Sequence, residues 1–168
     1  MDYQKASNYW IEKDKTSKKM DDNQLLKMIE EFIKKHNTLA LATGYGNEVR
    51  CTPIEYMYVD GYFYMFSEGG LKFKYLENNK NVSASIFEPY TTFSEIHSVQ
   101  ITGEIEVIED DETIKKILEL KGINPAALDK IKMSLHLLRL RAYKYEFLDS
   151  SVKLFGYSNR QTYIYVKK

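Results

Sequence analysis

The sequence has few of the features that mark secreted, disulfide-bonded or membrane proteins. It is 168 residues long and contains one cysteine, Cys51, which therefore has no internal partner for a disulfide bond. Chains without disulfides are typical of reducing compartments, so we expect a cytoplasmic protein. No apolar run approaches the ~20 residues of a membrane-spanning helix, and the N-terminal segment lacks the apolar core of a signal peptide. These features predict no association with a membrane.

The chain also lacks an excess of charge of either sign. Lysine plus arginine and aspartate plus glutamate both number 24, so the formal net charge is zero. Proteins with a general affinity for nucleic acid or for anionic membranes carry an excess of positive charge. We therefore expect neither kind of partner, although a local cationic pocket is compatible with a neutral chain.

Familiar catalytic and metal-binding motifs are missing as well. The three histidines, His36, His97 and His136, are far apart in the sequence and are accompanied by a single cysteine, which predicts no metal site. The sequence has no Gly-x-Ser-x-Gly elbow, Walker loop or Gly-x-Gly-x-x-Gly fingerprint. We therefore assign no catalytic residue, and we keep only His97, at the start of a predicted strand, as a candidate site histidine.

What the sequence does contain is a clear change of hydrophobic period. Apolar residues recur at helical spacing through "NQLLKMIEEFIKKH", after Asp21 or Asp22 as the cap. This pattern predicts an amphipathic helix that follows an N-terminal arm of residues 1–20. From Thr38 onward short strands are separated by turn residues, and Asp60-Gly61 is a strong signal for a two-residue hairpin.

Six strands joined mostly by hairpins are predicted within a single domain of residues 1–168. A short helix is expected over roughly residues 71–79, a helical insert over residues 111–135, and a tail over residues 150–168. Since strands and helices do not alternate regularly, the pattern favours a mainly β fold, a small antiparallel barrel with flanking helices, over a doubly wound sheet. The sixth strand, "LLRLRAYKYEFLD", changes its inward parity, which predicts a β-bulge near Ala142.

The most informative stretch is "GYFYMFSEGGLKFKYL", in which an aromatic strand runs into two glycines and two lysines. We expect "EVRCTPIEY" to form the neighbouring strand of the same hairpin, so that Arg50, Ser67, Lys72 and Lys74 converge. An arginine fork, a hydroxyl, two lysines and the free N–H groups of a helix start would together bind an anion such as a phosphate. The alternative is an ordinary strand-to-helix turn with two solvated lysines, and the residues alone leave both interpretations open.

The order of these segments resembles a known family. The stretch "NTLALATGYGNEVRCTPIEYMYVDGYFYMFSEGGLKFKYLENNKNVSASI" is similar to the pyridoxamine 5′-phosphate oxidase-like family, the flavin-binding split barrels. Family members place a helix before a strand of the type "atLat", then "R-x-x-P-hydrophobic", a "Y-F-h-T/S" strand, a turn with glycine and lysine, and "N-L-x-x-N-x-x-V-S". The similarity covers about residues 37–109.

The resemblance implies a six-stranded antiparallel split barrel that forms a homodimer, with two FMN molecules at the subunit interface. It also implies three groups of cofactor-binding residues. One group lines the FMN from the second strand, a second holds the phosphate and ribityl end, and a third comes from the start of the fifth strand of the other subunit. These groups are Arg50, Cys51, Thr52, Pro53 and Ile54; Ser67, Glu68, Gly70, Lys72 and Lys74; and His97, Ser98 and Gln100.

The C-terminal segment "GYSNRQTYIYVKK" lacks the Arg-x-His and Trp features of true pyridoxamine phosphate oxidases. The chain therefore looks more like the uncharacterised bacterial and nitroimidazole-resistance-like branches. For these we expect an FMN-dependent oxidoreductase that passes hydride or electrons from a nicotinamide donor to an unknown small-molecule acceptor. The alternatives are a non-catalytic flavin or ligand sensor, a split barrel that uses F420 or heme, and a structural domain that binds no cofactor.

Overall fold

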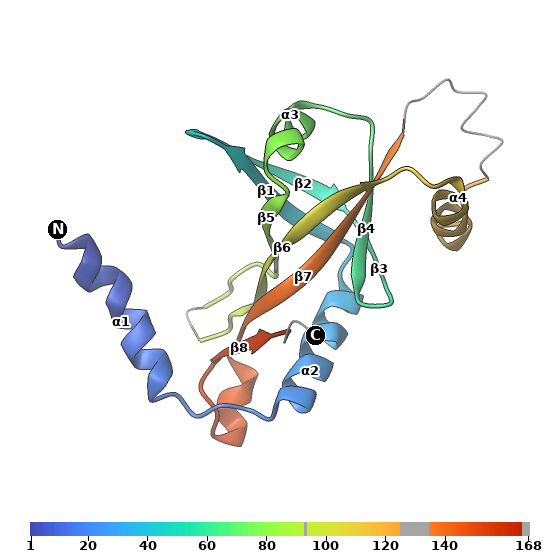
Figure 1. Ribbon diagram of the computed structural model, residues 1–168. Coiled ribbons are helices and arrows are strands. Elements are labelled where there is room, and N and C mark those ends of the chain that lie inside the picture. The colour runs from blue at the N-terminus through green and yellow to red at the C-terminus, as the bar shows by residue number, and fades with distance from the viewer. Residues whose placement is uncertain (93, 125–134, 166–168) are drawn as a thin grey trace.

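The computed structural model describes residues 1–92, 94–124 and 135–165. These residues form one strongly curved antiparallel sheet with helices at its ends and flanks (Figure 1). The helices are α1 (Tyr3–Lys15), α2 (Asp22–Lys35), α3 (Leu71–Asn78), α4 (Asp111–Leu120) and the 3-10 helix η1 (Ser151–Phe155). The strands are β1 (Thr38–Tyr45), β2 (Glu48–Glu55), β3 (Met57–Val59), β4 (Tyr62–Ser67), β5 (Asn81–Phe87), β6 (His97–Ile108), β7 (His136–Asp149) and β8 (Arg160–Ile164). None of the helices in this part of the chain is long and apolar enough to cross a membrane.

The strand order is β2-β1-β5-β6-β7-β4-β3, and β8 adds to β7. The strands β2 and β3 are consecutive in the chain but lie at opposite ends of this order, so the sheet curls round until its two edges approach each other. The result is a split barrel, and the predicted mainly β, antiparallel split-barrel fold with flanking helices is confirmed. The described residues form eight strands where the sequence predicted six, because the second predicted strand is divided at Tyr56 and the tail contributes β8.

One predicted pairing is wrong. The β2 strand pairs with β1, with Arg50 opposite Thr43, and only the short β3 pairs with β4. The chain leaves the β2 direction at Tyr56, whose backbone N–H donates to the carbonyl of Asn37 at 2.7 Å and whose hydroxyl donates to the carbonyl of Ile33, also at 2.7 Å. These two bonds tie Tyr56 to the end of α2. The Asp60-Gly61 signal correctly predicted a turn, but a turn signal does not say how far the ladder on either side continues.

The local helix and turn predictions are confirmed. Asp21 caps α2, since its carboxylate accepts from the N–H groups of Asn23 and Gln24. The helix buries the apolar positions that its period predicted, Leu25, Ile29, Phe32 and Ile33. In the β3–β4 turn, Asp60 and Gly61 have φ angles of 52° and 83°, which is the left-handed pair that a type I′ turn requires.

The predicted bulge lies next to Ala142. Along the β6–β7 ladder Thr102 pairs with Lys144 while Gly103 pairs with Ala142, so Tyr143 is the extra residue. Before the bulge Leu138 and Leu140 are buried, and after it Tyr145 and Phe147 are buried. The bulge thus keeps the inner face of β7 apolar from Leu138 to Phe147.

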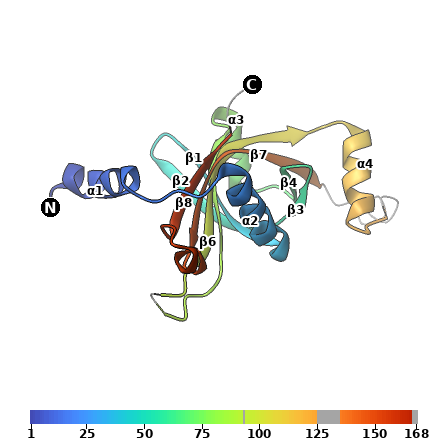
Figure 2. The same ribbon diagram turned by 90° about the horizontal axis from the view of Figure 1, so that it is seen from below.

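The N-terminal arm contains α1, in which no residue is buried and which projects away from the barrel (Figures 1 and 2). The segment after it is held by the buried side chain of Gln161 on β8. The Gln161 amide nitrogen donates to the carbonyls of Lys18 and Ser158, and its oxygen accepts from the N–H of Met20. The tail is therefore part of the sheet. Of the helical insert, α4 is described, and residues 125–134 lie outside the described residues.

Candidate functional site

The turn that follows β4 has an open, backbone-rich conformation. The hydroxyl of Ser67 accepts from the N–H of Gly69 and donates to its carbonyl, both at 3.2 Å. Gly69 and Gly70 have φ angles of 128° and 99°, a region that disfavours every residue with a Cβ. A Cβ built on Gly69 would meet nothing within 4 Å, so this side of the turn is open.

The turn leads directly into α3, whose N-cap is Gly70 and carries no side-chain cap. The first backbone N–H groups of a helix have no partner within the helix, and they carry partial positive charge. An uncapped helix start next to two glycines therefore presents N–H donors to a ligand that approaches from the open side.

Two cations face this turn. Lys72 is 8% exposed, and its ammonium donates to the carbonyl of Gly69 at 2.7 Å. Burial lowers the pKa of Lys72, and the positive charge of Arg50 lowers that pKa further. Arg50 is exposed and makes no ion pair or hydrogen bond with any residue that the structure describes. We call Arg50, Ser67, Gly69, Gly70 and Lys72 the cationic turn.

The inner face of β1 adds a residue that the sequence analysis missed. Thr43 lies opposite Arg50 in the β1–β2 ladder, so the two side chains share a face. The Thr43 hydroxyl is buried and has no hydrogen-bond partner within the described part of the chain. Such an unpaired buried hydroxyl is uncommon. The signal for it in the sequence was a threonine at the inward parity of "TLALATG", where Leu39 and Leu41 are apolar.

The other residues that the resemblance implied for β2 and α3 are arranged differently. Successive residues of β2 alternate between its two faces, so Thr52 and Ile54 share the face of Arg50 while Cys51 and Pro53 point to the opposite one. Lys74 is exposed, and its ammonium binds the carboxylate of Glu48 at 3.1 Å. Glu68 is exposed beside the turn. The predicted convergence therefore holds for Arg50, Ser67 and Lys72, whereas Lys74 points elsewhere.

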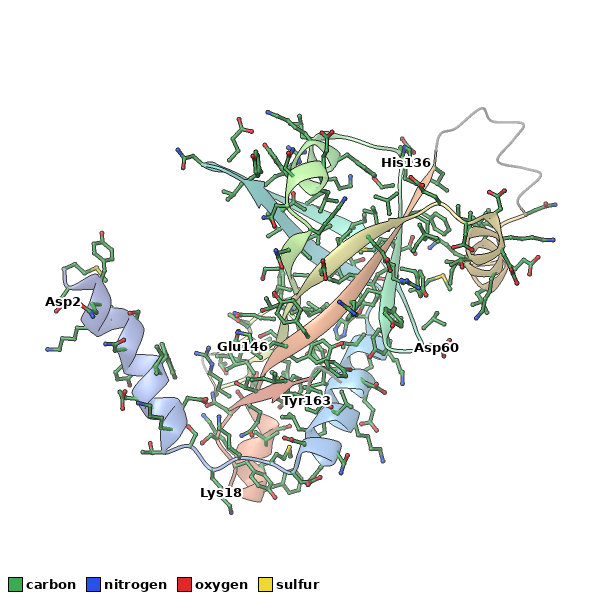
Figure 3. All side chains as sticks on the ribbon, viewed as in Figure 1. Asp2, Lys18, Asp60, His136, Glu146 and Tyr163 are labelled. Carbon is green, nitrogen blue, oxygen red and sulfur yellow. The ribbon has the colours of Figure 1, made fainter. Side chains whose placement is uncertain are left out.

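The predicted residues of β6 lie far from the cationic turn within one chain. Ser67 pairs with His136 at one end of β7, whereas His97 pairs with Asp149 at the other end. In Figure 3 His136 and Glu146, the β7 partner of Gln100, lie at opposite ends of that strand. At about 3.3 Å per residue of strand, the distance from His136 to Glu146 along β7 is on the order of 33 Å. The His97 ring nitrogen Nδ1 lies 3.3 Å from the carboxylate of Asp149, Ser98 is buried and Gln100 is exposed.

Comparison with known proteins gives the family. The family model described as pyridoxamine 5′-phosphate oxidase matches residues 25–148. No match was found among curated proteins.

Three solved structures illustrate the range of similar proteins. A FAD-binding protein from Mesorhizobium loti is 18% identical, with 71% of this chain and 89% of that chain covered and a TM-score of 0.56. A putative 5-nitroimidazole antibiotic resistance protein from Bacteroides thetaiotaomicron is 16% identical, with coverages of 69% and 78% and a TM-score of 0.57. The heme storage protein HutZ from Vibrio cholerae is 19% identical, with coverages of 69% and 88% and a TM-score of 0.54.

At these identities the solved structures establish a common fold, and the family match covers most of the barrel. The chain therefore belongs to the pyridoxamine 5′-phosphate oxidase family.

Proposed function

We propose that this protein is a flavoprotein that binds FMN, with the phosphate of FMN in the cationic turn. The observation that carries the proposal is the open, uncapped start of α3, where the buried Lys72 ammonium lies 2.7 Å from the carbonyl of Gly69. Two positive charges stand close enough for Arg50 to lower the pKa of Lys72, and no described carboxylate forms an ion pair with either of them. An incoming dianion would relieve this repulsion and accept hydrogen bonds from both side chains.

The remaining donors of the cationic turn fit the same ligand. The uncapped N–H groups at the start of α3 can donate to phosphate oxygens, and the hydroxyl of Ser67 can do so once it turns from the carbonyl of Gly69. The glycines at positions 69 and 70 allow the ligand to approach the backbone closely. The unpaired hydroxyl of Thr43, on the face of Arg50, is a further candidate donor.

The edge of the sheet beside this turn suits a flat ring. The strand β2 is the terminal strand of the order and has β1 as its only strand partner among the described strands. Pro53 lacks an N–H and is tolerated at such an edge. The free backbone groups between Cys51 and Ile54 are thus available to hydrogen-bond the isoalloxazine ring. FMN would supply the redox chemistry, while the protein would orient the ring and neutralise the phosphate.

A homodimer completes the proposed site. His97, Ser98 and Gln100 lie too far from the cationic turn of their own chain to contact the same flavin, so in this proposal they contact the flavin held by the other subunit. Large apolar side chains remain exposed in the monomer, among them Val49 on β2 at 86% and Phe87 on β5 at 59%. Exposed apolar groups of this kind are typical of surfaces that another chain covers.

The first experiment is an absorbance spectrum of the purified protein before and after FMN is added and the excess is dialysed away. We expect one retained flavin per subunit and a particle mass of two chains in solution. The double variant Arg50→Gln with Lys72→Gln should lose the flavin, whereas Lys27→Gln, which changes an exposed lysine on α2, should retain it. A wild-type protein that takes up no flavin, or a double variant that binds it as tightly, contradicts the proposal.

The same preparation separates the alternatives. We propose that reduced nicotinamide bleaches the bound flavin and that an added small-molecule acceptor restores its colour. A bound flavin that no nicotinamide donor reduces would instead favour a sensor. Since similar proteins include a FAD-binding protein and a heme storage protein, heme and F420 are tested by competition against FMN. Displacement of FMN by either ligand at lower concentration would change the cofactor assignment.

A further inference from the structure

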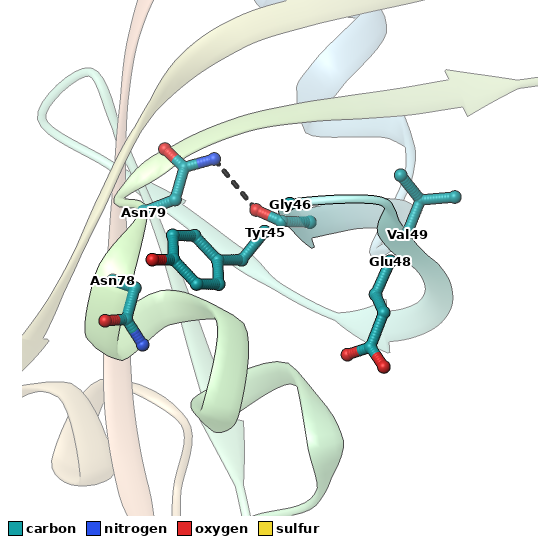
Figure 4. A pocket seen from close by; sticks show the side chains of 7 residues that line it. Tyr45, Gly46, Glu48, Val49, Asn78 and Asn79 are labelled. Atoms are coloured by element: carbon teal, nitrogen blue, oxygen red, sulfur yellow. Dashed lines mark hydrogen bonds between the residues drawn. The ribbon is translucent and has the colours of Figure 1, made fainter.

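A concave surface lies at the C-terminal end of α3, at the opposite end of the helix from the cationic turn. It is a hollow of about 460 Å³ between the tip of the β1–β2 hairpin and the last turn of the helix (Figure 4). In the close-up, the Tyr45 ring lies beside Asn78 and Asn79, and Glu48 and Val49 lie on the opposite side. We call this hollow the hairpin groove. It is lined by Gly44, Tyr45, Gly46, Glu48, Val49, Asn78 and Asn79.

One wall of the hairpin groove is rigid. The Asn79 side chain donates from its amide nitrogen to the carbonyl of Gly44 at 2.8 Å, and its oxygen accepts from the N–H of Asn81 at 3.1 Å. These bonds tie the end of α3 to β1 and to the start of β5. This wall of the groove is therefore held by hydrogen bonds between the Asn79 side chain and the backbone, which suits a preformed binding site.

Three other side chains of the groove can contact a ligand, and of these Glu48 is already paired with the Lys74 ammonium at 3.1 Å. The ring of Tyr45 is 55% exposed and makes no hydrogen bond or ring contact with the residues that the structure describes. The amide of Asn78 is exposed and has one long bond, at 3.4 Å, to the carbonyl of Lys74. A bare aromatic face stacks on a nucleobase, and an asparagine amide can pair with the edge of adenine. The carboxylate of Glu48 can accept from ribose hydroxyls, as acidic residues do in dinucleotide sites.

The helix connects the hairpin groove to the cationic turn along one exposed face. Leu71, Lys74 and Asn78 are spaced three and four residues apart, so they lie in a row along α3. From the first to the last residue of α3 the rise is about 10 Å, which is comparable to the length of a second phosphate and a ribose. Lys74 lies in the middle of this row, and its ammonium forms an ion pair with the carboxylate of Glu48 at 3.1 Å.

We propose that the hairpin groove binds the adenosine half of FAD, with the second phosphate beside Lys74. This inference rests on the proposed function, because it requires the first phosphate of the flavin in the cationic turn. It goes beyond that function in making the dinucleotide, rather than FMN, the preferred form of the cofactor. Tyr45 and Asn78 then determine specificity for the adenine ring.

The test compares the dissociation constants of FMN and FAD for the full-length protein by flavin fluorescence. Because stacking on one aromatic residue changes affinity on the order of 10-fold, we expect FAD to bind about 10-fold more tightly than FMN. Tyr45→Ser should abolish this preference by weakening FAD alone. Tyr90→Ser is the matched control, since Tyr90 is 62% exposed and lies outside the groove, and it should leave both constants unchanged.

The outcomes distinguish the two proposals. If neither flavin binds, the proposed function fails and this inference falls with it. If FMN binds and FAD binds no more tightly, the inference alone is overturned. It is also overturned if Tyr45→Ser weakens FMN and FAD equally, because Tyr45 would then act on the fold or on the shared flavin half. Retained FMN binding by Tyr45→Ser shows that the variant is folded.

Discussion

Gly103 illustrates how single residues allow this barrel to close. It lies on β6 opposite the bulge in β7, and a Cβ at this position would overlap the carbonyl oxygen of Arg141 and lie 2.8 Å from Cδ1 of Leu140. The bulge brings the two backbones together, and only a residue without a side chain fits between them. The close approach of the two strands also positions β7 to pair with β4 near one end and with β8 near the other.

Gly103→Ala should therefore lower the free energy of unfolding by about 1–3 kcal/mol, the usual cost of overpacking. Urea denaturation followed by circular dichroism measures it. Ser83→Ala, at an exposed position of the neighbouring strand β5, is the control and should change the value by less than ~0.5 kcal/mol. An equally small effect at position 103 would mean that the bulge relaxes to accept a methyl group.

Among the elements, α1 contrasts with the segment that follows it. The helix buries none of its residues, whereas Lys18 and Met20 are held by Gln161 of β8. An isolated helix of 13 residues is marginally stable in water. The Asp2 carboxylate accepts a capping bond from the N–H of Lys5. The exposed ion pair between Lys15 and Glu12 adds little to the stability of the helix.

Deletion of residues 1–15 removes the contact of the Trp10 ring with the Arg160 guanidinium, 5.4 Å from the ring centroid, and should therefore lower the free energy of unfolding by no more than about 1 kcal/mol. In contrast, Gln161→Ala should cost about 1–3 kcal/mol, because it removes the partner of the buried Met20 N–H and of the Ser158 carbonyl, while the Lys18 carbonyl keeps its bond from the N–H of Ser158. Both values come from urea denaturation at one protein concentration. A large loss of stability on deletion of α1 would indicate that the arm packs on a second copy of the chain.

At the scale of the whole molecule, buried tyrosines make the stability of the fold depend on pH in the alkaline range. Burial raises the pKa values of Tyr56, Tyr58 and Tyr145 above the ordinary value. The folded state therefore keeps protons that the unfolded chain releases above about pH 10. Stability is fully present below that pH and is lost as the pH rises further. The lowered pKa of Lys72 acts in the opposite direction, but it is one group against four tyrosines, because burial also raises the pKa of Tyr165.

We expect the urea midpoint to fall steadily between about pH 9 and about pH 11. Tyr145→Phe should make this fall shallower. At neutral pH this variant should lose no more than about 1 kcal/mol, because the buried Tyr145 hydroxyl interacts only loosely with the hydroxyls of Tyr58 and Tyr165. A midpoint that is independent of pH over this range, or an unchanged slope in the variant, would contradict the assignment of these groups as buried and neutral.

Much of the local structure followed from short-range patterns. The 3.6-residue period and the cap at Asp21 predicted α2, Asp60-Gly61 predicted the β3–β4 turn, and the parity change in β7 predicted its bulge. The glycines and lysine of the cationic turn were also recognisable in the sequence, because two successive positions with positive φ angles strongly favour glycine. Each of these features depends on interactions between residues close together in the chain.

The amino-acid sequence by itself determined α2, α3, most of the strands, the resemblance to the split-barrel family and the residues of the cationic turn. Only the tertiary structure decided that β2 pairs with β1, that Gln161 draws the tail into the sheet, and that Tyr45 meets Asn78 across a groove. It also separated Lys72, which is buried in the turn, from Lys74, which is bound to Glu48. Such choices depend on contacts between distant segments, which no local period or turn signal encodes.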